Sequence, residues 1–107
     1  MDLIHDRWFD LNQVKYDAAQ HKVTFEFGEK KNGPFDQELT IKAVTGYQID
    51  DEAHIQIYDI NEVQIDPSTR LITITSSFPL TIEIQVEDNW EIIIASSAES
   101  GKNNSSE

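Results

Sequence analysis

The chain has 107 residues, contains no cysteine, and carries 20 acidic against eight basic side chains, which gives a formal net charge of −12. Such a length allows one domain with a core of its own, and the missing cysteines exclude disulfides and thiolate chemistry. The charge argues against nucleic acids and anionic membranes as partners, because phosphate groups are held by clusters of Lys and Arg.

The first residues, MDLIHDRW, carry acidic side chains where a signal peptide would need a basic region and an apolar run. No apolar stretch further along the chain approaches the length of a membrane-spanning segment. We therefore expect a cytoplasmic protein that does not insert into a membrane.

Alternating apolar and polar residues predict β-strands throughout the chain. The clearest of them, in chain order, are residues 23–27, 39–43, 55–57 and 80–87. Turn-forming pairs separate such segments, namely Gly33-Pro34, Asp66-Pro67 and Asp88-Asn89. No long stripe with helical spacing interrupts this pattern, so we expect an all-β protein.

A segment of twenty residues recurs at an offset of 49. HDRWFDLNQVKYDAAQHKVT (residues 5–24) and HIQIYDINEVQIDPSTRLIT (residues 54–73) are identical at six positions. After a gap, LTIKAV (39–44) resembles LTIEIQV (80–86), and GYQI (46–49) resembles NWEI (89–92). Internal repeats indicate a duplicated unit, here residues 5–49 and 54–92. We predict about eight strands in two similar four-stranded units, arranged as a sandwich or a barrel.

The folded body and the C-terminal segment differ in composition. We expect a single all-β domain over residues 1–95. Residues 96–107 are polar with almost nothing to bury, which predicts a disordered tail. Residues 1–95 keep 18 acidic and seven basic side chains, a net charge of −11, so the negative charge belongs to the folded body.

The apolar phase changes inside each copy of the repeat. Phe9 and Leu11 share one parity, whereas Val14 and Tyr16 take the other, and the same change recurs over residues 58–65. A slip of one residue within a strand is what a β-bulge produces. We expect bulges at residues 11–13 and 60–62, with Phe9, Val14, Tyr16 and their counterparts all facing the core.

The segment Asp6-Arg7-Trp8 is replaced in the second copy by Ile55-Gln56-Ile57. Arg and Trp are the residue types that dominate the energetics of protein interfaces, so Arg7 and Trp8 are candidates for contact with a partner. The alternative is that Trp8 covers an open end of the core while Arg7 pairs with a nearby acid.

The start of the chain has the form His-Asp-x-x-[Leu/Phe], followed by a strand, an Asp turn and another strand. The residues concerned are His5, Asp6, Phe9, Val14, Tyr16 and Asp17. This segment, about the first quarter of the chain, resembles several groups of small uncharacterised bacterial all-β proteins. Some of those proteins stand beside polymorphic toxins as immunity proteins. The resemblance implies an immunity-like role and no catalytic residues.

Two short motifs lack the context that their chemistry needs. Asp51-Glu52-Ala53-His54 spells the box of DEAH helicases, but the phosphate-binding GxxxxGK[ST] loop is missing from the sequence. His5-Asp6 spells the HD pair of metal phosphohydrolases, whose helical scaffold a β chain does not supply. The sequence also has no cysteine and no GxSxG elbow. We predict no catalytic residues and no cofactor.

A metal site is the alternative interpretation of the acidic cluster. Asp50, Glu52 and His54, joined by His5 across the pseudo-symmetry, offer oxygen and imidazole ligands. Their spacing matches no Ca²⁺ loop, and acid clusters in so acidic a chain are usually solvated turns. The prediction is therefore that no metal is bound.

Three functions compete. The predicted one is a small acidic protein that engages or inhibits a basic protein partner, steered by its charge; the same charge also serves solubility. The candidate contact residues are Arg7, Trp8, Asp50, Asp51, Glu52, Glu83, Glu87 and Glu91. A β-barrel or sandwich that holds a small apolar ligand is the second, with the lining residues Phe25, Phe27, Phe35 and Trp90. The third is a metal-dependent hydrolase.

Overall fold

The computed structural model describes residues 5–96 and confirms the all-β prediction for them. The elements are β1 (Trp8–Asp10), η2 (a 3-10 turn, Leu11–Gln13), β2 (Lys15–Asp17), β3 (Lys22–Gly28), β4 (Gln37–Asp51), β5 (Ile57–Asp59), β6 (Glu62–Asp66), β7 (Leu71–Thr75) and β8 (Leu80–Ser96). The eight strands belong to a single sheet, and every pairing between them is antiparallel.

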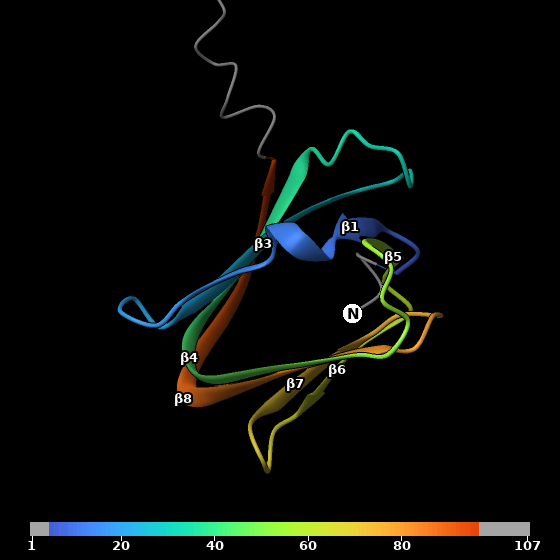
Figure 1. The fold of residues 1–107 in the computed structure, drawn as a ribbon. Coiled ribbons are helices and arrows are strands. Elements are labelled where there is room, and N and C mark those ends of the chain that lie inside the picture. Colours follow the sequence, from blue (N-terminus) through green and yellow to red (C-terminus); the bar gives the residue numbers. More distant parts are fainter. Residues whose placement is uncertain (1–4, 97–107) are drawn as a thin grey trace, which may run out of the picture.

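The sheet curls into a half-barrel instead of forming the two separate layers of a sandwich. Its strand order is β5-β1-β3-β4-β8-β7-β6, with β2 also paired to β3. The long strands β4 and β8 turn the same corner side by side, so that β3 and β7 come to lie on opposite sides of the core (Figure 1). At this corner the register of β4 against β8 shifts between Lys42 and Gly46, and Ala43 adopts a φ of 63°. Such irregularities let a strand bend sharply.

The two units of the repeat carry corresponding strands. β1 and β5 lie 49 residues apart, and so do His21 and Arg70, which both have a φ of 55°. The carbonyl of His21 accepts a hydrogen bond from Val44 N at 2.8 Å, and that of Arg70 accepts one from Val86 N at 3.0 Å. Moreover, corresponding strands pair with each other, β1 with β5 and β4 with β8.

The long strands β4 and β8 match each other in a different register from the one that the sequence comparison gave. Phe25 pairs with Leu39 in β4, and Ile74, its counterpart 49 residues later, pairs with Ile82 in β8. Leu39 therefore matches Ile82, and the comparison that sets Leu39 against Leu80 is two residues out. An alternating pattern has a period of two, so a shift by two leaves it unchanged.

The ends of the sheet meet where β5 passes into β6. These strands stand at opposite ends of the strand order, yet only Ile60 and Asn61 separate them. Ile60 is held to the β1 side, because its amide donates to the Arg7 carbonyl at 2.7 Å and its carbonyl accepts from Asp6 N at 2.9 Å. The next amide, that of Asn61, donates to the Thr75 carbonyl at 2.7 Å. The chain thus closes one side of the half-barrel.

The concave face of the sheet holds the core. Its buried apolar residues are Phe9, Val23, Phe25, Phe27, Leu39, Ile41, Val44, Tyr58, Ile60, Val63, Ile72, Ile74, Leu80, Ile82, Ile84 and Val86. Phe9 contacts both Phe25 and Tyr58, at ring-centroid distances of 5.2 and 6.2 Å. Among the described residues, no polar or charged side chain apart from the Tyr58 hydroxyl belongs to this set.

The change in the parity of the apolar residues does not come from a plain β-bulge. In the first copy η2 fills residues 11–13, and Asp10 caps it by accepting a hydrogen bond from Asn12 N at 2.9 Å. Val14 is half-buried as expected, but the expectation for Tyr16 is wrong, because its side chain is 39% exposed. Tyr16 lies on the short strand β2, which pairs only with β3, and its ring packs against Tyr47 at 5.4 Å.

No helix within residues 5–96 is long and apolar enough to span a membrane. The predicted tail begins one residue early, because Ser96 is the last residue of β8. The remainder of that segment, residues 97–107, lies outside the described residues.

Candidate functional site

One convex surface of the half-barrel is free of basic side chains. The antiparallel register aligns two rows of residues across β6, β7, β8 and β4: Glu62, Thr75, Thr81 and Asp50 in one row, and Gln64, Thr73, Glu83 and Gln48 in the next. Most of these residues alternate with buried neighbours such as Ile74, Ile82 and Ile84, so the rows lie on the outside. Ile49, between Gln48 and Asp50, is 37% exposed but pairs with the buried Ile82. We call this surface the acidic face.

The acidic face is slightly hollowed where β4 meets β8. Asp50, Glu83, Gln48 and Thr81 line a shallow depression of about 240 Å³. Carboxylates of two neighbouring strands therefore face the same depression, with only amide and hydroxyl groups between them. Glu62, at the outer edge, lies on an alternating position of β6 that sequence reasoning did not single out.

The convex surface on the other side of the corner, over β2, β3 and the adjoining parts of β4 and β8, is mixed in charge. There Lys15 aligns with Thr24 of β3, Lys22 aligns with Lys42 of β4, and Lys42 aligns with Glu91 of β8. Glu87 and Glu91, both predicted as partner contacts, line a depression at the corner of the sheet together with Lys42 and His21. They therefore do not belong to the acidic face.

Asp51 serves an internal role, although it was also a candidate for partner contact. Its carboxylate accepts hydrogen bonds from the Tyr58 hydroxyl and from His54 N, the latter at 3.0 Å. The hydrogen bond from Tyr58, with that from His54, lowers the pKa of Asp51. Burial and the same carboxylate raise the pKa of Tyr58. Asp51 thus fixes the loop after β4 to a core tyrosine, while Glu52 beside it stays exposed.

Asp59 attaches β5 to the loop after β7, a role that sequence reasoning missed. Its carboxylate accepts from Ser77 N at 3.0 Å and from the hydroxyls of Ser77 and Ser76 at 2.7 and 2.5 Å. Burial opposes the ionisation of Asp59, but these hydrogen bonds outweigh it and hold the pKa below its ordinary value. In the sequence, the only indication of this role of Asp59 is the pair of adjacent serines after β7.

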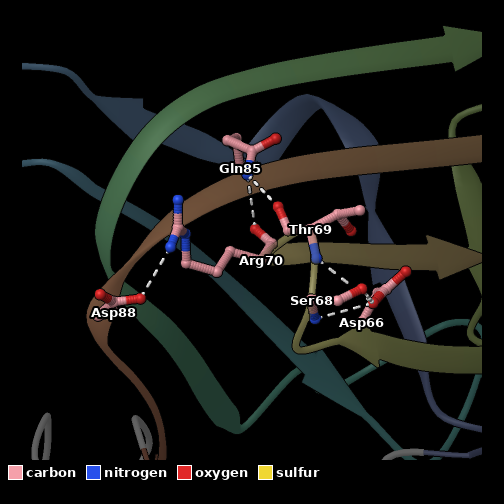
Figure 2. A network of polar contacts seen from close by, with 6 residues as sticks. All are labelled: Asp66, Ser68, Thr69, Arg70, Gln85 and Asp88. Atoms are coloured by element: carbon pink, nitrogen blue, oxygen red, sulfur yellow. Dashed lines mark hydrogen bonds and ion pairs between the residues drawn. The ribbon is translucent and has the colours of Figure 1, made fainter.

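A polar network holds the turn between β6 and β7 against β8 (Figure 2). Asp66 accepts hydrogen bonds from Ser68 N and Oγ at 3.0 and 2.8 Å, and these lower the pKa of its carboxyl. Gln85 donates to the carbonyls of Thr69 and Arg70 at 2.7 and 2.9 Å. Arg70 pairs with Asp88 at 2.9 Å. This is the one contact within 4.0 Å between a Lys or Arg and a carboxylate in the described part of the chain.

Arg7 and Trp8 lie apart from the acidic face. Arg7 lines a cleft of about 500 Å³ between the start of β1, the loop before β4 and the end of β8. Its Nε is buried and has no hydrogen-bond partner within residues 5–96. Trp8 is half-buried, with the Lys31 ammonium 5.9 Å from its ring centroid. The expected pairing of Arg7 with an acid is therefore not seen in this part of the chain.

The residues considered for a metal do not converge. His5 Nδ1 lies 2.7 Å from the Asn61 carbonyl, and its Nε2 lies 3.5 Å from Asp6. Across residues 5–96 no three His, Asp or Glu side chains are grouped so that they could hold a metal ion. The proposed set of Asp50, Glu52, His54 and His5 is accordingly not assembled.

No family model matches the chain, and no curated protein matches it. The crystal structure of an uncharacterised protein from Neisseria gonorrhoeae is similar over 84% of this chain and 90% of that one, with 12% identity and a TM-score of 0.49.

Proposed function

We propose that this protein binds a basic protein partner through the acidic face. The supporting observation is the difference between the two sides of the half-barrel: the two convex rows across β6, β7, β8 and β4 carry Asp50, Glu62 and Glu83 with no Lys or Arg, whereas lysines are interspersed on the convex side of β2, β3 and the first half of β4. Threonines and glutamines fill the positions between these acids, so the surface offers hydrogen bonds as well as charge.

Such a face acts mainly on the rate of encounter. Carboxylates without nearby cations attract a positively charged partner over about one Debye length, which is ~8 Å at physiological salt. Electrostatic complementarity of this kind raises the association rate more than it raises affinity. Binding that uses the acidic face is therefore fast at low salt and slows steeply as salt is added.

The N-terminal resemblance gives this proposal a direction. Because some of the similar small β proteins stand beside toxins, we infer that the partner is a basic, toxin-like enzyme. The acidic face would inhibit it by covering its cationic surface. Residues His5, Asp6 and Phe9 carry the resemblance, and none of them lies on the acidic face.

The apolar-ligand alternative gains no support from the packing of the aromatic residues named for it. Phe25 and Phe27 are both 1% exposed, and their rings contact each other at 6.2 Å within the core. Phe35 and Trp90 are half-buried. A ligand placed among the first two would have to displace packed side chains.

A pull-down from the source lysate at low and high salt tests the proposal with two matched variants. One is Asp50→Asn/Glu62→Gln/Glu83→Gln, on the acidic face. The control, Glu26→Gln/Glu38→Gln/Glu91→Gln, removes the same charge from the mixed-charge convex surface on the other side of the corner. In the pull-down we expect a basic partner that high salt removes and that the control variant retains. The association rate of this partner with the acidic-face variant should be roughly tenfold lower than with the wild type. Partners that are not basic, or equal losses in both variants, would refute the proposal.

A further inference from the structure

The cleft at Arg7 is a second feature, separate from the acidic face. Its lining includes Arg7, Glu29, Lys30, Asp36, Gln37 and Ser96, contributed by the start of β1, the loop between β3 and β4, and the end of β8. A volume of about 500 Å³ falls within the range of small-molecule sites. Segments that are distant in the sequence thus meet around one polar cleft.

The fold does not need an arginine at this position. The repeat sets Arg7 against Gln56, one residue before β1 and β5 respectively. Gln56 has an internal partner, since its Nε2 donates to Asp10 at 2.9 Å. For Arg7 the contact that supports the sheet is its backbone carbonyl, which accepts from Ile60 N. Any residue supplies a carbonyl, so the guanidinium is free for another purpose.

One nitrogen of that guanidinium has no partner within the described part of the chain. Its Nε is buried without a hydrogen-bond partner, and it forms no ion pair there. A buried donor without a partner carries an uncompensated desolvation penalty, and such groups in native proteins call for an explanation. Arg7 also lines the cleft, so a ligand bound there meets this arginine.

The wall of the cleft formed by the loop before β4 is fixed in place by close backbone packing. A Cβ on Gly28 would lie 2.2 Å from the Pro34 carbonyl oxygen, so the loop over residues 29–36 rests directly on the end of β3. Lys31 of the same loop reaches the Trp8 ring. The cleft is therefore preformed, which lowers the entropic cost of binding.

The charges that line the cleft identify its ligand class. Arg7 and Lys30 are balanced by Glu29 and Asp36, in a body whose residues 5–96 carry a net charge of −10. A phosphate dianion would meet two carboxylates here, whereas a ligand with both charges can satisfy both pairs. We propose that the cleft binds a small zwitterion, an amino acid or short peptide, with its carboxylate at Arg7 and Lys30 and its ammonium at Glu29 and Asp36. Arg is suited to the first role because its planar fork matches a carboxylate.

NMR titration of the ¹⁵N-labelled full chain tests this inference with four probes. Glycylglycine carries both charges, N-acetylglycine only the carboxylate, glycinamide only the ammonium, and inorganic phosphate is the competing anion. We expect glycylglycine to shift the Arg7 Nε–H signal and the amides of residues 28–37 saturably. The single-charge probes and phosphate should bind at least about tenfold more weakly.

Two variants assign the effect to Arg7. Arg7→Gln should weaken glycylglycine binding about tenfold or more, whereas Arg70→Gln, which removes the arginine paired with Asp88, should leave it unchanged. If Arg7→Gln does not fold, Arg7→Lys keeps the charge but loses the planar fork, and weaker binding by its folded form supports the assignment. Phosphate binding as tight as glycylglycine, no saturable shifts, or full binding by a folded Arg7 variant overturns the inference. Because no protein partner is involved, these results are independent of the acidic face.

Discussion

Replacing Asp59 by alanine tests how the second unit secures its short strand. In the first unit β1 forms a backbone pairing with the end of β3, where Trp8 stands opposite Gly28. In the second unit β5 reaches the segment after β7 through the Asp59 carboxylate, which accepts from Ser76 and Ser77. The variant removes all these hydrogen bonds and leaves the β1–β5 pairing in place.

The magnitude follows from the contacts. Three hydrogen bonds at about 1 kcal/mol each amount to about 3 kcal/mol, and water can replace part of them at the exposed Ser77, so we expect a loss of about 2 kcal/mol. For a domain of this size that lowers Tm by roughly 8–15 °C. The equivalent change Asp10→Ala is the matched control. Asp10 accepts from Asn12 N and Gln56 Nε2, both exposed, and its loss should cost about 1 kcal/mol.

The pH dependence gives a second, independent readout. The pKa of Asp59 is lowered in the folded protein, so its stabilisation is complete above the unfolded-state pKa of about 3.9 and is lost as the pH falls through the folded-state value. Thermal unfolding followed by circular dichroism should show a Tm difference between the wild type and Asp59→Ala that is constant from about pH 8 to 5 and shrinks toward pH 3. Equal losses for Asp10→Ala and Asp59→Ala, or a difference that does not shrink in acid, would contradict the anchoring role.

Three further changes have definite expected outcomes. Gly28→Ala should lower Tm by more than 10 °C, roughly, because its Cβ would clash with the Pro34 carbonyl at 2.2 Å; a smaller shift would show that the loop yields easily. Tyr47→Phe removes a buried hydroxyl without a partner within residues 5–96 and should raise stability by about 1 kcal/mol in denaturant unfolding. Burial also raises the pKa of Tyr47 to about 12, so wild-type stability should fall between pH 10 and 12, and Tyr47→Phe should remove that part of the fall. Ile84→Ala should cost about 2–5 kcal/mol, since Ile84 is fully buried; a loss below 1 kcal/mol would show a core that readily collapses around the gap.

Periodicity predicted the strands at 23–27, 39–43 and 80–87 because each buries one face. It misplaced the strand expected at 55–57, since β5 begins only at Ile57, and the turn expected at Asp88-Asn89 lies inside β8. Val23, Phe25 and Phe27 of β3 and Ile72 and Ile74 of β7 are all buried, as their alternation requires. The curvature could not be predicted, because it depends on how β4 and β8 turn their corner. The residue with a positive φ at that corner is Ala43, and an alanine gives no indication in the sequence of an unusual backbone dihedral. For the same reason alternation alone did not separate a sandwich from a half-barrel.

The candidate site was predicted less completely than the fold. A carboxylate looks the same in sequence whether it faces solvent or accepts internal hydrogen bonds, which is why Asp51 was grouped with Asp50 although Tyr58 engages it. Cross-strand neighbours decide the local charge, and they depend on register: Glu91 stands beside Lys42, whereas Glu83 stands beside Gln48. Only the assembled sheet shows that the acidic face lacks basic side chains.

Corresponding strands of the two units pair with each other, and this pairing predicts how a polypeptide with only one unit would behave. Strands β1 and β5 face each other, β4 and β8 do the same, and Val44 stands opposite its own counterpart Val86. This is the arrangement of an isologous dimer, in which one surface is complementary to itself. A polypeptide that contains a single unit would present those same edges to another copy, and two of them could rebuild the curled sheet by self-association.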